Sequence, residues 1–234
     1  APINASMSCM STINEFLSTP EVNSCFPYTK TILPALTNSS QDPIAILDSI
    51  CSLPKCSDSL ISSFLSTVKK GCAQDLAQNN TDIVTLTELI PLYSPTRDSI
   101  CFKGPSGGYC LTDDSVLVQK YGVNTNSSDP LSNVPASDFC TNCNKAIVNT
   151  YLNFIKTNPG VIDPLLSPVQ VTGLKAIMTD KCGSSFLDGK IPDTTSKTTY
   201  SNSPQKSNNG SSFRFSSVNY FISIATILAL LIFY

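Results

Sequence analysis

The sequence contains no histidine and no tryptophan among its 234 residues. The absence of histidine excludes Ser-His-Asp and Cys-His catalysis and most zinc hydrolases. The absence of tryptophan, together with eight tyrosines that form no cluster, disfavours an aromatic platform for carbohydrate. The sequence therefore predicts a protein that is not an enzyme and has no catalytic residues, cofactor or metal.

Charged side chains are also scarce, and neither sign dominates. They make up 14% of the chain, with 15 lysines and arginines against 17 aspartates and glutamates. The longest basic run is Lys69-Lys70, so the sequence lacks the basic field that nucleic-acid binding requires. Serine, threonine and asparagine supply much of the polar surface instead, as is common outside cells. We expect no nucleic-acid partner.

Ten cysteines are the strongest positive feature, and none of them lies in the C-terminal tail. A zinc site would be expected to use matched cysteine pairs, usually with histidine. Ten cysteines in an oxidising compartment instead predict five disulfides. The predicted disulfide residues, whose pairing the sequence leaves open, are Cys9, Cys25, Cys51, Cys56, Cys72, Cys101, Cys110, Cys140, Cys143 and Cys182.

Asn-x-Ser/Thr motifs agree with secretion, because they are acceptors for N-linked glycans. They begin at Asn4, Asn38, Asn79, Asn126 and Asn209. The chain starts with Ala1-Pro2, which suits a mature protein whose signal peptide has been removed.

The last residues, 220–234, form an uncharged apolar tail. As a helix it would span roughly 22 Å, less than a bilayer core of about 30 Å. A spacer, residues 212–219, precedes it, and small residues precede the spacer. This is the pattern of a glycosylphosphatidylinositol (GPI) attachment signal, with Asn209 as the predicted attachment residue and Gly210 or Ser207 as alternatives. An ordinary single-span anchor is the other interpretation.

The body of the chain shows helical periodicity. Two Asp-Pro pairs, Asp42-Pro43 and Asp163-Pro164, predict N-caps followed by proline at the first helical position. No run of residues alternates like a strand, so the predicted fold class is all-α, a disulfide-stapled helical bundle. The apolar stripes are Ile44, Leu47 and Ile50; Leu60, Ile61, Phe64, Leu65 and Val68; Ile83, Leu86, Leu89 and Ile90; Ile147, Val148, Tyr151, Leu152 and Ile155; and Leu174, Ile177 and Met178.

Two of these segments match each other without gaps. Residues 56–70 align with residues 143–157, and each segment begins with a cysteine. We interpret the cysteine-rich helical domain, residues 1–188, as two related halves, 1–96 and 97–188. Residues 189–211 are predicted to be a disordered Ser/Thr/Asn-rich linker that carries the GPI site, and residues 212–234 a spacer and tail removed on maturation.

Three motifs have both a structural and a functional interpretation. Cys140-Thr-Asn-Cys143 resembles a redox motif, but each cysteine more simply ties a helix start to another helix. The glycine-rich segment 101–110 predicts a tight turn, stapled if Cys101 pairs with Cys110, or a recognition loop. Asp113-Asp114 is better explained as a helix N-cap region than as a catalytic carboxylate pair.

The spaced cysteines, the Cys101–Cys110 loop, the Phe139-Cys140-Thr-Asn-Cys143 motif and the linker with its tail resemble fungal GPI-anchored, cysteine-rich surface proteins. In particular, they resemble fungal helical families of unknown function. The resemblance implies the extracellular face of the plasma membrane or the cell wall, and transfers no functional residue.

These features predict a structural or adhesive surface protein. Its partners would be the membrane, through the GPI lipid anchor, and a cell-wall polysaccharide, protein or lipid ligand. A lipid- or sterol-binding module is the alternative, because disulfide-stapled amphipathic helices can enclose a lipid.

Overall fold

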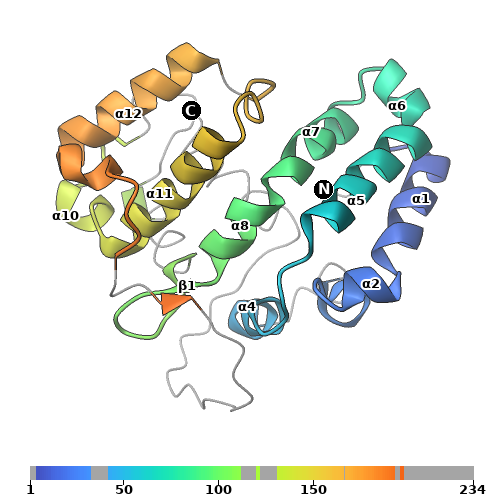
Figure 1. Cartoon of the computed structure of the whole chain (residues 1–234), viewed down its shortest axis with the longest axis horizontal. Helices are drawn as coiled ribbons and strands as arrows, with labels where there is room; N and C mark the ends of the chain where they lie inside the picture. Colours follow the sequence, from blue (N-terminus) through green and yellow to red (C-terminus); the bar gives the residue numbers. More distant parts are fainter. Residues whose placement is uncertain are drawn as a thin grey trace. The chain divides into compact units, whose positions relative to one another are not determined.

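The computed structural model describes residues 4–32, 42–111, 120–121, 131–165, 167–192 and 196–197 (Figure 1). The chain is mostly helical and cross-linked by five disulfides, which confirms the predicted all-α, disulfide-stapled fold class. Its described residues fall into two compact units, residues 4–93 and 94–197.

Unit 1 consists of short and medium helices. Its elements are α1 (Met7–Leu17), α2 (Pro20–Asn23), the π-helix η1 (Tyr28–Ile32), α4 (Pro43–Cys51), α5 (Asp58–Gly71), α6 (Ala73–Ala77), α7 (Thr81–Leu89) and the 3-10 turn η2 (Ile90–Leu92).

The core of unit 1 lies where α1, α5 and α7 pack together (Figure 1). The predicted stripes supply it, because Val68 of α5 and Ile83 of α7 are fully buried against Cys9 and Ile13 of α1. The disulfide Cys9–Cys72 ties α1 to the end of α5. The helices thus bury their apolar faces against one another, as periodicity predicts.

Side-chain caps define where the helices of unit 1 begin. Asp42 accepts a hydrogen bond from the Ile44 N–H, so the N-cap predicted before Pro43 is confirmed. Ser57 caps α5 in the same way, and its neighbour Cys56 is bonded to Cys25. The start of α5 is therefore fixed both covalently and by its cap.

Unit 2 is built around a long central helix. Its elements are α8 (Tyr93–Ile100), β1 (Phe102–Lys103), α10 (Ala136–Phe139), α11 (Asn142–Thr157), α12 (Pro168–Cys182), the 3-10 turn η3 (Ser184–Leu187) and β2 (Ser196–Lys197). The first residue of α8, Tyr93, still belongs to unit 1.

An apolar cluster joins α10, α11, α12 and η3 in unit 2. The predicted stripe residues Val148, Leu174 and Met178 lie in it, and the ring centroids of Phe139 and Phe186 are 5.8 Å apart. The buried members of this cluster are Leu131, Val134, Phe139, Val148, Leu174, Met178 and Phe186.

The N-cap predicted at Asp163 is wrong. Asp163 and Pro164 lie in a turn, and α12 begins only at Pro168. Ser167 caps that helix in a reciprocal capping box with Gln170, which satisfies two backbone N–H groups and fixes the start there.

The sequence left open whether Cys101 pairs with Cys110 across the glycine-rich segment. Cys110 bonds to Cys143 instead. The predicted turn still forms, because Gly104 N donates to Gly108 O at 2.9 Å and Gly107 adopts φ +79°. A left-handed glycine closes this turn without a covalent staple.

In the described chain β1 pairs with β2 in antiparallel fashion, and an isolated antiparallel bridge joins Lys103 to Tyr109. Residues 196 and 197 belong to the segment predicted as linker, so at least this part of it pairs with the folded unit. No helix within the described ranges combines the length and apolarity needed to cross a bilayer.

Candidate functional site

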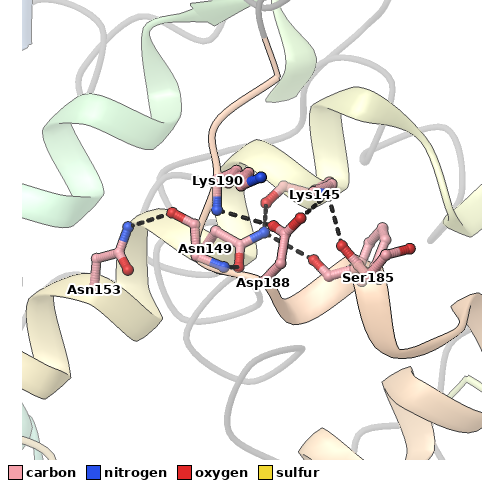
Figure 2. A network of polar contacts seen from close by, with 8 residues as sticks. Lys145, Asn149, Asn153, Ser185, Asp188 and Lys190 are labelled. Atoms are coloured by element: carbon pink, nitrogen blue, oxygen red, sulfur yellow. Dashed lines mark hydrogen bonds and ion pairs between the residues drawn. The ribbon is translucent and has the colours of Figure 1, made fainter.

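One face of α11 carries a row of polar residues that hold the segment following α12. Lys145, Asn149 and Asn153 are spaced four residues apart and so lie on one side of the helix. We call these three the clamp residues. They contact residues 184–190, which we call the strap, and Figure 2 shows the contacts.

Asn149 is the centre of the site and is fully buried. Its Nδ2 donates to the carbonyl oxygen of Phe186 at 2.8 Å and to that of Lys145 at 2.9 Å. Its Oδ1 accepts from the N–H of Gly189 at 2.8 Å. The amide therefore uses both donors and its acceptor, as a buried polar group must.

Lys145 grips the strap at a second point. Its Nζ donates to the Ser185 carbonyl oxygen at 2.6 Å and forms a 2.9 Å ion pair with Asp188 Oδ2. The Lys190 N–H and then the Lys145 ammonium hold the pKa of Asp188 below its usual value. Asp188 therefore stays ionised and keeps this grip at neutral pH.

Asn153 completes the row through Gly189. Its Nδ2 donates to the Gly189 carbonyl oxygen at 2.8 Å. Gly189 has φ +79°, and a Cβ placed on it would lie 3.1 Å from Asn153 Oδ1. Backbone conformation and available space both require glycine at this position.

The strap is also held on its apolar side. Phe186 is buried in the cluster of unit 2, and the disulfide Cys140–Cys182 ends just before the strap. Gly183, with φ +82°, ends α12 and turns the chain into the strap. The segment from Cys182 to Gly189 is thus held by a disulfide, by the buried ring of Phe186 and by the clamp residues.

The chemistry of this site is that of attachment. Most clamp contacts end on main-chain atoms of the strap, and its one carboxylate is committed to Lys145 and the Lys190 N–H. The arrangement therefore holds a chain segment against α11.

The disulfide prediction is confirmed, because none of the ten cysteines is free. The pairs Cys9–Cys72, Cys25–Cys56, Cys110–Cys143 and Cys140–Cys182 form within the units, and Cys51 and Cys101 are disulfide-bonded as well. Cys140 and Cys143 belong to different disulfides, as the structural interpretation of the C-x-x-C motif predicts.

The glycan and anchor predictions fall on different parts of the chain. Asn4 and Asn79 are described and exposed, and their glycosylation stays a prediction. The other predicted residues lie outside the described part of the chain, namely the attachment candidates Asn209, Gly210 and Ser207, the acceptors Asn38 and Asn126, and the Asp113-Asp114 pair.

Unit 1 has a shallow depression of about 460 Å³ beside the Cys25–Cys56 disulfide. Serine hydroxyls near the start of α5 line it together with Glu21 and Lys55. Pro54 and Leu60 add apolar surface to the same lining. Within the described residues, no group of three His, Cys, Asp or Glu side chains is arranged to hold a metal ion.

A family model described as a domain of unknown function (DUF7729) matches residues 3–191. The chain belongs to the DUF7729 family. No curated protein and no solved structure matches it. The DUF7729 match covers the described residues of unit 1 and ends one residue after Lys190, so the clamp residues and the strap are both part of the family domain.

Sequence reasoning missed the clamp, although its signal is present. Lys145, Asn149 and Asn153 form a second stripe on the helix whose apolar stripe was recognised. Polar residues at helical spacing are usually solvated, however, and only the fold shows that the strap covers this row.

Proposed function

We propose that this DUF7729 protein is a non-enzymatic protein of the fungal cell surface or cell wall, held by a GPI anchor and acting in a structural or adhesive role. The domain would stand outside the cell, and residues 189–211 would connect it to the membrane. In this role the protein acts through its stability and its contacts with other wall components, and the clamp supports it by holding main-chain atoms of the strap.

The disulfides support the extracellular part of the proposal. Ten cysteines without a free thiol are consistent with an extracellular or secreted protein, because disulfides persist in oxidising compartments. Each bond also limits the unfolded state, so the domain resists unfolding where chaperones are absent.

The observation that carries the proposal is the clamp on α11. A tethered protein is pulled at the point where its chain leaves the domain. Here the chain pairs with unit 2 once more beyond the strap, at β2, so tension from the C-terminal side would first reach the β1–β2 pair. It would then reach the strap, which Asn149, Lys145 and Asn153 hold immediately after Cys140–Cys182. Tension from an anchor would meet hydrogen bonds and a disulfide before it reached the apolar core.

The anchor is tested by blocking every candidate attachment residue. The full gene is expressed in a fungal host with Ser207, Asn209 and Gly210 each changed to glutamine, which is too large for the attachment position. We expect the parent protein to be released from cells by phosphatidylinositol-specific phospholipase C and the triple variant to be absent from the surface.

A matched control changes Asn202→Gln, Ser201→Gln and Ser203→Gln in the same linker, and this variant should behave like the parent. Retention of the attachment-site variant with unchanged phospholipase release would show that the anchor is attached at another residue. A parent protein that the phospholipase does not release would eliminate the GPI anchor. A variant retained but resistant to the enzyme would indicate a single membrane span.

The role is tested on the secreted protein by binding and by native mass spectrometry. A structural or adhesive protein should sediment with purified cell-wall polysaccharide or bind a wall protein. Its mass in native mass spectrometry should show no small-molecule adduct. A stoichiometric lipid or sterol adduct that is lost on denaturation would replace this role with that of a lipid carrier.

A further inference from the structure

Two glycan acceptors that lie far apart in sequence meet at one end of unit 1. The Asn4 N–H donates to Asp82 Oδ2 at 2.7 Å, and Asn80 Nδ2 donates to the Asn4 carbonyl oxygen at 2.6 Å. Asn80 is the middle residue of the Asn79-Asn80-Thr81 acceptor. The Asn4-Ala5-Ser6 acceptor is therefore bonded directly to the second one.

The fold treats the hydroxyl groups of the two acceptors differently. Ser6 Oγ donates to Asp75 Oδ2 at 2.6 Å and accepts from the Cys9 N–H as the N-cap of α1. The Ser6 N–H also donates to Asp75 Oδ1, at 2.8 Å. Asp75 is buried, and these bonds lower its pKa, so it remains an ionised, strong acceptor.

The Cys9–Cys72 disulfide secures this arrangement. Cys9 lies three residues after Ser6, and Cys72 lies three residues before Asp75. The bond closes a separation of 63 residues and brings the Ser6 and Asp75 partners together. In the unfolded, reduced chain residues 4–6 are not held against α6, and the Ser6 hydroxyl is not bonded to Asp75.

The second acceptor is presented outward. Asn79 is exposed at the turn between α6 and α7 with φ +54°, and Thr81 is exposed at the first position of α7. The cap of α7 is formed by the Asn80 side chain, which accepts from the N–H groups of Asp82 and Ile83. The Thr81 hydroxyl is therefore not needed as a cap.

Glycan transfer requires the hydroxyl of the third residue, since only serine or threonine serves there. The asparagine Nδ2 forms a bond to the anomeric carbon of a lipid-pyrophosphate-linked oligosaccharide. The bond from that carbon to the pyrophosphate oxygen breaks, the lipid pyrophosphate leaves with the electron pair, and Nδ2 gives up one proton to a base. A hydroxyl locked onto Asp75 cannot take part.

We propose that Asn4 accepts a glycan only before unit 1 folds and the Cys9–Cys72 disulfide closes, whereas Asn79 remains an acceptor in the folded unit. Both glycans then leave from the same end of unit 1. This order rests on the proposed extracellular function for its biological setting, but the acceptor chemistry can be measured without a cell.

The test uses the full chain, made without glycans in a disulfide-forming bacterial host and kept in detergent. The oxidised folded chain and the reduced, alkylated chain are each given a purified oligosaccharyltransferase and a lipid-pyrophosphate-linked oligosaccharide. Peptide mass spectrometry reports occupancy at Asn4 and Asn79. We expect occupancy at Asn4 to fall at least about tenfold on folding, and occupancy at Asn79 to change less than about twofold.

Two variants separate the hydroxyl from the rest of the contact. Asp75→Ala removes the acceptor of Ser6 Oγ and should raise Asn4 occupancy in the folded chain several-fold. Asp82→Ala removes only the acceptor of the Asn4 N–H, so it should leave Asn4 blocked. Circular dichroism and intact disulfide mass confirm that each variant is folded.

Equal occupancy of Asn4 in the folded and reduced chains would overturn the proposal, and so would a folded Asp75→Ala chain in which Asn4 stays blocked. Loss of Asn79 occupancy on folding would overturn its second half. If the protein instead carries no glycan when made by cells, the extracellular function fails while the result on the purified chain stands.

Discussion

Helices α5 and α11 start from the same pattern and reach different degrees of burial. Each begins beside a cysteine that bonds to another cysteine upstream, 31 residues away for Cys56 and 33 for Cys143. Val68 alone is buried on α5, whereas α11 buries seven residues, two of them asparagines. A shared apolar stripe therefore fixes which face packs, but not how much of the helix is covered.

The difference lies in the polar row. The positions of α5 that align with Lys145, Asn149 and Asn153 are Asp58, Ser62 and Ser66, and all three are exposed. The two serines are shorter than the asparagines that reach the strap, and Asp58 has no N–H to donate to a backbone carbonyl group, as Lys145 does. Side-chain length and donor groups at three positions thus distinguish an exposed helix face from one that holds a further chain segment.

The largest expected effect compares the two matching disulfides. In the chain-entropy account, closing loops of 31 and 33 residues contributes nearly equally, about 4 kcal/mol each. We expect the variants Cys25→Ala/Cys56→Ala and Cys110→Ala/Cys143→Ala to lose similar free energies of unfolding, measured by urea denaturation under oxidising conditions. A difference above about 2 kcal/mol would show that local strain or packing, rather than chain entropy, sets the contribution.

The next effect contrasts Asn149 with Ser62. Asn149→Ala removes three hydrogen bonds and leaves buried groups of Phe186 and Gly189 without their partner. We expect a loss of about 3 kcal/mol and faster hydrogen exchange at Gly189. Ser62→Ala, the aligned and exposed control, should stay within about 0.5 kcal/mol of the parent. Equal costs for the two variants would refute the role given to the polar row.

Two glycines of unit 2 give a smaller contrast. Gly189→Ala places a Cβ at φ +79° and 3.1 Å from Asn153 Oδ1, so we expect a loss of about 1–2 kcal/mol. Gly173 lies inside α12 with no atom within 4 Å of an added Cβ, and Gly173→Ala should stabilise the protein by about 0.5–1 kcal/mol. Thermal unfolding measures both, and shifts of the same sign would contradict this prediction.

The smallest effect is a pH dependence of the clamp. Hydrogen bonds lower the pKa of Asp188 in the folded protein. The contribution of Asp188 to the free energy of unfolding is therefore fully present above the pKa of the unfolded chain, about 3.9. It is lost as the pH falls through the folded value. Asp188→Asn should therefore be less stable than the parent near neutral pH, and the gap should close in acid. Urea midpoints across this range measure it, and a gap independent of pH would rule out Asp188 as its source.

Lys145→Met is the matched variant for that experiment. It removes the ammonium but keeps the hydrogen bond from the Lys190 N–H, which is the largest contribution to the lowered pKa of Asp188. The pH-dependent difference in stability between the parent and Lys145→Met should therefore be smaller than the difference between the parent and Asp188→Asn.

The fold class and the packing faces could be predicted because both follow from local patterns. The stripe ending at Val68 and the stripe containing Tyr151 form helices, and Asp42 caps the helix it was expected to cap. The N-cap prediction at Asp163 was wrong because the preference for an N-cap residue before proline is only local. Ser167 with Gln170 offers the competing start, and its capping box satisfies two backbone groups.

The disulfide map and the clamp were beyond local patterns. Cys110 is nine residues from Cys101 in sequence, yet it bonds to Cys143, because α11 brings that thiol to it. Asn149 in a helix predicts nothing about a partner forty residues later, at Gly189. Both depend on long-range packing, which a single sequence does not record.

The clamp has a consequence for how the family can diversify. Helix α11 recognises the strap through the carbonyl groups of Ser185, Phe186 and Gly189 and the N–H of Gly189, and every residue type offers a carbonyl group. Exposed positions such as Ser184 and Ser185 are thus open to drift, while the helix side of the contact is not. Among relatives, we expect the clamp residues of α11 to be conserved. The strap should vary in sequence except at the positions of Gly189 and Phe186.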